Sequence, residues 1–165
     1  MVKRHLFLGV RVLAVCSVLV ASVVASACQP TTRYSVGQAA PLAAGATIRC
    51  TAAAETSVGV QLTFEVSNSS GADLGIPSRP VRPTVIGPDG KPLQLTSIET
   101  SITGGGGGFG PAAAGNPPYL GPGGVMHVVA AIDTASIGVT LKPPLTVTYA
   151  PLGQEQVSFV VVPAR

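Results

Sequence analysis

The stretch Val58-Gly-Val-Gln-Leu-Thr-Phe-Glu-Val-Ser67 decides the fold class of this 165-residue chain. Apolar and polar side chains alternate along it: Val60, Leu62, Phe64 and Val66 against Gln61, Thr63 and Glu65. A period of two places the apolar set on one face of a strand and leaves the polar set in water. A helix would scatter the four apolar side chains around its circumference. The stretch therefore predicts a half-buried β-strand.

Other segments have the same character and are separated by turn residues. They are Thr47–Thr51, Arg82–Ile86, Leu93–Ile98, Val125–Ile132, Leu145–Tyr149 and Val157–Val161, with Tyr34–Val36 as a candidate edge strand. Gly87-Pro88-Asp89-Gly90-Lys91 predicts a hairpin turn, because Pro presets φ and Gly accepts a positive φ. Seven to eight short strands predict an all-β fold, an immunoglobulin-like antiparallel β-sandwich. The chain has no Trp and no Cys…Trp…Cys pattern, which argues against antibody-type kinship.

The composition agrees with an all-β chain and excludes one class of function. Charged residues make up 10% of the chain, against roughly 25% in an ordinary soluble domain, while Gly (20) and Pro (15) are abundant. Three of the ten basic residues precede position 28 and all seven acids follow it, so the remainder is electrically balanced. A chain without a basic surface cannot neutralise phosphates, and nucleic-acid binding is not expected.

The first residues predict an export signal. Lys3 and Arg4 form a positive start, and sixteen uncharged residues follow from Val12 to Ala27. That run is shorter than the roughly 20 residues of a membrane span and typical of a signal peptide. We expect a signal peptide of the lipoprotein type at 1–27, a linker at 28–45 and a β-sandwich domain at 46–165.

Ala25-Ser26-Ala27-Cys28 resembles the lipobox of bacterial lipoproteins, with Ala25 in place of the usual larger aliphatic residue. The resemblance implies a lipid on Cys28 that holds the protein to the extracytoplasmic face of the cell membrane. The alternative is ordinary secretion. Cys16 leaves with the signal, so Cys28 and Cys50 remain and could form a disulfide in an oxidising compartment. Lipidation and the disulfide exclude each other.

A second resemblance covers roughly residues 34–162. It is carried by Tyr34-Ser35-Val36-Gly37, Leu62-Thr63-Phe64-Glu65-Val66-Ser67-Asn68, Gly87-Pro88-Asp89-Gly90 and Leu120-Gly121-Pro122-Gly123-Gly124. This order is similar to the immunoglobulin-like (telokin-like) domain of unknown function found in many exported bacterial lipoproteins. The mycobacterial immunogenic secreted β-sandwich proteins belong to the same general group. The resemblance implies extracytoplasmic interaction roles and transfers no catalytic residue. The Gly-rich insertion after Ile102 and the low aromatic content depart from the family pattern.

The Gly/Pro-rich loop at 103–124 contains five consecutive glycines, Gly104 to Gly108. A phosphate-binding loop needs a Lys and a Ser or Thr after its glycines, and none follows here. Long loops are often functional, so Phe109 and Tyr119 are our candidate partner-binding residues.

The remaining candidate chemistry is sparse. Met126-His127 offers too few soft ligands for a copper site, and we expect His127 to be a core or rim residue and the chain to bind no metal and no cofactor. The seven acids are scattered singly, so a Ser-His-Asp set would need His127 and an acid from another strand. Arg79-Pro80-Val81-Arg82-Pro83 reads as a segment whose prolines block edge pairing, with an anion site as the alternative. Asn68-Ser69-Ser70 is a glycosylation sequon only in a eukaryotic host.

These observations predict no catalytic residue and therefore no enzyme. We expect a surface-tethered, non-enzymatic binding module of the bacterial cell envelope, held to the membrane by its N-terminal lipid. Its partner would be an envelope protein or a host component. The alternatives are an extracytoplasmic carrier of a small ligand or metal ion and, less favoured, an envelope enzyme.

Overall fold

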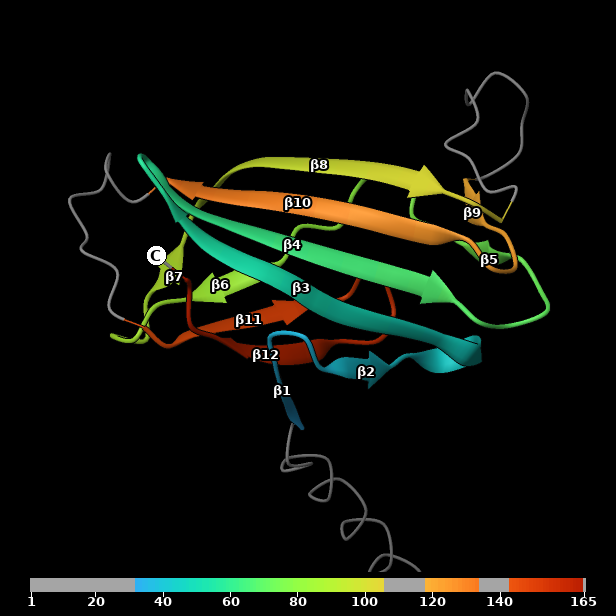
Figure 1. The fold of residues 1–165 in the computed structure, drawn as a ribbon, viewed down its shortest axis with the longest axis horizontal. Coiled ribbons are helices and arrows are strands. Elements are labelled where there is room, and N and C mark those ends of the chain that lie inside the picture. The colour runs from blue at the N-terminus through green and yellow to red at the C-terminus, as the bar shows by residue number, and fades with distance from the viewer. Residues whose placement is uncertain (1–31, 106–117, 134–142, 165) are drawn as a thin grey trace, which may run out of the picture. The chain divides into compact units, whose positions relative to one another are not determined.

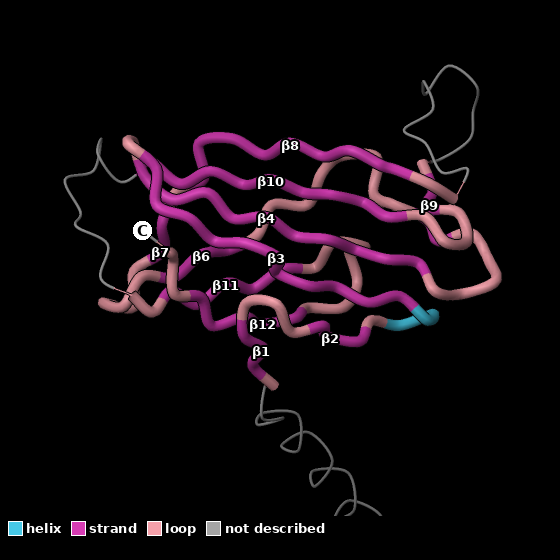
Figure 2. The backbone as a smooth tube through the Cα atoms, viewed as in Figure 1, coloured by secondary structure: helices cyan, strands magenta, loops and turns pink. Residues whose placement is uncertain are grey.

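The chain is all β in the computed structural model, which describes residues 32–105, 118–133 and 143–164. Within these residues there are twelve β-strands, one 3₁₀ turn at Ala43–Gly45 and no α-helix. Figure 2 shows the strands in magenta and the short turn in cyan. None of the described segments is a helix long and apolar enough to cross a membrane. The expected signal peptide, Cys28 and Phe109 lie outside the described residues.

Two five-stranded sheets stack on each other as a sandwich (Figure 1). The first, called the long sheet, has the order β2 (Ala39–Pro41), β3 (Ala46–Thr56), β4 (Gly59–Asn68), β10 (Val125–Asp133), β8 (Leu95–Thr103). The second, called the short sheet, has the order β1 (Arg33–Ser35), β12 (Val157–Val161), β11 (Leu145–Tyr149), β6 (Thr84–Ile86), β7 (Pro92–Leu93). A separate pair joins β5 (Leu74–Gly75) to β9 (Tyr119–Leu120).

The predicted alternation is confirmed in β4, where the apolar set is buried and Gln61 is exposed. Strand β10, which looked continuously apolar, alternates as well. Its even-numbered residues from Met126 to Ile132 are buried, and its odd-numbered residues are half-exposed. It lies between β4 and the edge strand β8, with antiparallel pairing on both sides.

The core is aliphatic except at one place between the sheets. There the Phe64 ring of β4 lies 5.8 Å from the Phe159 ring of β12 and 5.2 Å from the Tyr149 ring of β11. Tyr34 of β1 packs on Phe159 at 6.1 Å. Tilted aromatic pairs at these distances add to the stabilisation from burial alone. The cluster therefore joins both sheets and the first strand.

The predicted hairpin turn is confirmed between β6 and β7. Gly87 N donates to Lys91 O at 2.8 Å, and Gly90 has a φ of 79°. The expected strand Leu93–Ile98, however, is divided between the two sheets. Leu93 stays with the hairpin in β7, whereas Leu95 begins β8 in the long sheet. Alternation predicts which face a residue uses, but it does not say to which sheet the strand belongs.

Residues 33–45 were expected within the linker 28–45, with Tyr34–Val36 as a candidate edge strand, and they contribute β1, which is an edge strand, and β2 to the sheets. Strand β1 pairs in parallel with β12, and β2 pairs antiparallel with β3. Ala40 and Leu42 are buried in the core. The sandwich is thus not wholly antiparallel. The described strands exceed the expected seven to eight because β2, β5 and β9, only two or three residues long, were not predicted, and because the expected strand Leu93–Ile98 is divided between β7 and β8.

We predict that Phe64→Ala destabilises the fold by about 3–5 kcal/mol, because it removes the ring that contacts both partners in the opposite sheet. Chemical denaturation of the processed chain, followed by circular dichroism, measures the change. Val58, which is 61% exposed, is the control. Val58→Ala should change the stability by less than about 0.5 kcal/mol. Equal effects of the two substitutions would contradict the assigned core.

Candidate functional site

The outer face of the long sheet carries the one described histidine. Register places Arg49, Glu65, His127 and Ser101 in one row across four strands. Thr103 Oγ1 lies 3.2 Å from His127 Nε2, and among the described residues the ring has no carboxylate within 4 Å. His127, which we expected to be a core or rim residue, is half-buried on the outer face of the sheet. An imidazole with a hydroxyl but no third, orienting group is not the arrangement of an activated nucleophile.

No group of three His, Cys, Asp or Glu side chains converges within the part of the chain that the structure describes. The two arginines of the proline-rich segment, Arg79 and Arg82, are exposed and precede β6. The geometry around these residues builds neither a metal centre nor an enclosed anion site.

Asn68 is a structural residue whose role the sequence did not indicate. It is buried at the end of β4, and its Nδ2 donates to the carbonyls of Ala72 at 2.9 Å and Leu120 at 2.8 Å. Its Oδ1 accepts from the Ser70 N–H at 2.9 Å and from the Ser70 hydroxyl at 2.7 Å. The amide thereby ties the turn after β4 to β9. In this fold the sequon nitrogen already makes two hydrogen bonds in the interior.

We predict that Asn68→Ala costs about 2–4 kcal/mol of stability, because it removes the donor to the buried Leu120 carbonyl, one of the two donors to the Ala72 carbonyl and the acceptor for Ser70. Thermal unfolding measures the loss. Ser69→Ala, at the exposed neighbouring position, should stay within about 0.5 kcal/mol of the parent. A stable Asn68→Ala variant would show that these hydrogen bonds are replaceable by water.

Cys50 lies on the inner face of β3 and is a fully buried, free thiol. Burial raises its pKa to about 11, because the thiolate would lose its hydration. The thiol is therefore protonated and unreactive at neutral pH. Since Cys28 is outside the described residues, the choice between lipidation and a Cys28–Cys50 disulfide stays open.

The ends of the Gly/Pro-rich loop belong to the folded structure. Tyr119 pairs with Gly75, and its side chain is 36% exposed, while Leu120 is fully buried. Gly105 has a φ of 60°, and a Cβ there would collide with the Gly124 backbone. Of the two candidate partner-binding residues, Tyr119 is thus on a surface strand, and Phe109 is not described.

A cleft of about 190 Å³ opens at the end of the sandwich beside β5. Its lining comes from three distant parts of the sequence: Leu42, Ala43, Ala44, Leu74, Gly75, Leu152, Gln154 and Glu155. Glu155 Oε2 accepts from Ala43 N at 2.6 Å, and Ala44 has a φ of 58°, which is uncommon for a residue with a side chain. No motif in the sequence indicated this cleft, because its residues are far apart in the chain.

The four sheet edges differ in how far they are protected. β1, β2 and β7 have two or three residues each, and β2 and β7 contain Pro41 and Pro92. β8 has nine residues, Leu95–Thr103, without Pro or Lys, and its register with β10 shifts only near its start. Short strands and prolines are the usual protection of an edge, so β8 is the least protected of the four.

Comparisons with known proteins assign no relative to this chain. No family model matches it, and no curated protein matches it either. Its function must be argued from its own residues.

Proposed function

We propose that the chain is a surface-tethered, non-enzymatic binding module of the bacterial cell envelope. In this proposal an immunoglobulin-like (telokin-like) sandwich is held by a lipid on Cys28 and recognises an envelope protein or a host component. The observation that carries the proposal is the position of the four edge strands on two sides of the sandwich. β1 and β2 are the edges on one side, and β7 and β8 are the edges on the other.

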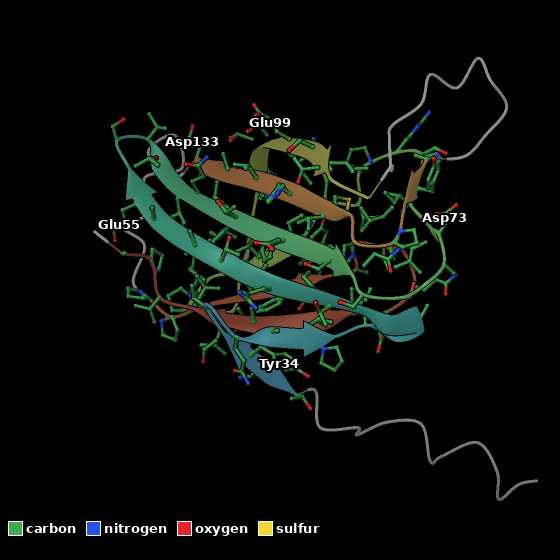
Figure 3. The ribbon with its side chains drawn as sticks, turned by 45° about the vertical axis from the view of Figure 1, so that its right-hand side comes forward. Tyr34, Glu55, Asp73, Glu99 and Asp133 are labelled. Atoms are coloured by element: carbon green, nitrogen blue, oxygen red, sulfur yellow. The ribbon has the colours of Figure 1, made fainter. Side chains whose placement is uncertain are left out.

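Figure 1 shows β1 and β8 on opposite sides of the sandwich, and Figure 3 shows Tyr34 and Glu99 on opposite sides as well. The first described strand, β1, therefore lies at one side of the sandwich. A tether attached there leaves the β8 side free to meet a partner. Two or more acyl chains on one cysteine give durable membrane attachment, so the sandwich itself need contribute nothing to anchoring.

The surface chemistry supports binding over catalysis. The charged side chains of the outer sheet face come singly from separate strands, as Arg49, Glu65 and Glu99 do. The interior is apolar, with aromatic contacts between its sheets. A rigid core with single charges on its surface suits recognition by shape and isolated polar contacts.

We predict that Cys28 of the full-length protein, expressed in a bacterium, carries acyl chains. Intact mass spectrometry of the membrane fraction should show the leader removed and lipid added. Cys28→Ser should abolish the lipid mass, and Cys50→Ala, the matched control, should retain it. A mature protein without lipid, lighter by the two hydrogens lost in a Cys28–Cys50 bond, would show ordinary secretion instead.

We further predict that the processed chain from residue 29, immobilised, retains a protein from the envelope fraction of its own bacterium. The described core lies within residues 40–161, so this form keeps it. Heat-unfolded chain is the control bait, and a retained protein must then bind the purified chain with 1:1 stoichiometry. No retention beyond the control would contradict the proposal.

The cleft beside β5 favours one alternative, a carrier of a small ligand. Three leucines make it mainly apolar, and the Glu155 carboxylate and Gln154 amide give it a polar end. Such a cleft suits a small molecule with an apolar body. A small ligand that raises the melting temperature of the processed chain, together with no retained protein, would favour the carrier.

A further inference from the structure

We propose that the β8 edge binds its partner by strand addition, and that the partner is an extended protein segment with a basic side chain opposite Glu99. The inference deepens the proposed function and rests on it for the existence of a protein partner. In strand addition, backbone hydrogen bonds supply affinity and alternate side chains supply specificity.

The β8 edge has the geometry for this mode. Its register with β10 is regular from Ser97 to Thr103, and five of the nine residues of β8 are exposed, whereas no residue of its neighbour β10 is. β8 pairs only with β10 in the long sheet, of which it is the last strand. Among the described residues, none of β8 joins the backbone hydrogen bonds made outside the sheets. Its outer N–H and C=O groups are therefore an available template.

The side chains of β8 define the added strand. Ser97, Glu99 and Ser101 are exposed on one face, and Ile98 and Ile102 are half-buried against the core on the other. Because side chains of paired strands lie on the same face when directly opposite, the added strand should alternate aliphatic and polar residues. Its polar set should include a Lys or Arg opposite Glu99.

The charge of Glu99 also indicates whether β8 pairs with a different protein or with a second copy of this chain. Antiparallel pairing of two β8 strands over all nine residues would place Glu99 opposite its own counterpart. Like charges directly opposite each other destabilise a ladder, whereas opposite charges stabilise it. A basic partner strand is thus favoured over self-pairing.

The test uses the processed chain and a capped peptide, Thr-Val-Thr-Val-Lys-Val-Thr-Val-Thr. Amide hydrogen exchange by NMR should slow at alternate residues of β8 when the peptide is added. Two N-methylated forms of the peptide distinguish backbone pairing from side-chain docking. In each form the amides along one edge of the extended peptide are methylated, so that edge cannot donate hydrogen bonds. One form should bind like the parent and the other should not bind. Equal behaviour of the two forms would overturn the inference.

Charge reversal tests the specificity. Glu99→Lys should weaken peptide binding by about fivefold or more, and a peptide with Glu in place of Lys should restore it. Glu55→Lys is the matched control, an exposed glutamate on β3 that is separated from β8 by two strands. Figure 3 shows the two glutamates well apart. Equal effects of the two reversals would overturn the role of Glu99.

Two further results separate this inference from the proposed function. If Glu99→Lys bait retains the envelope partner as well as the parent does, the β8 inference fails while the binding module stands. If neither bait retains a protein, the proposed function fails. Analytical ultracentrifugation should find a monomer, and a dimer abolished by a proline in β8 would overturn the choice of partner.

Discussion

The contact of Phe64 with Tyr149 and Phe159 is the constraint on which the rest of the sandwich depends. The chain has seven Phe and Tyr residues, and three of them meet there, with Tyr34 packed beside them. The other buried side chains are mainly aliphatic and small, and each covers less area than an aromatic ring. The relative position of the two sheets is therefore fixed at one place, where strands from both sheets contribute rings.

The same cluster also fixes the position of the first described strand, β1, at one edge of the sandwich. Because Tyr34 packs on Phe159 and β1 pairs with β12, the first described strand is held against the core. The position from which a tether would leave is thus set by core packing rather than by a loose linker. With β1 fixed at one edge, the order of strands places β8 at the other side. In the proposed function, anchoring and recognition would then occupy separate surfaces of one small fold.

The sequence predicted the elements that follow a residue pattern, namely the strands and the hairpin turn. It did not predict the features that depend on contacts between single residues far apart in the chain. Alternation in β4, β11 and β12 and the turn around Gly90 were sufficient for the all-β fold and the hairpin. The crossing between sheets after Leu93 was not predictable, because both neighbouring strands use the same period. Strands of two or three residues, such as β2, β5 and β9, are too short to show a period. The cleft and the Asn68 network join residues far apart in the chain, and distance along the sequence hides such contacts.

Because the chain has few charged residues, the single carboxylate of Glu99 affects strand pairing at the β8 edge more than one surface acid normally would. Edge strands are commonly guarded by Lys, Pro or a bulge, and β8 has only a register shift against β10 near its start, so its regular part, Ser97–Thr103, risks pairing with another copy of the chain. Here one carboxylate at the centre of the strand penalises the most extensive self-pairing. The same carboxylate favours a strand that brings a cation to that position. Specificity is a difference between two affinities, and one charge lowers the unwanted affinity while raising the wanted one.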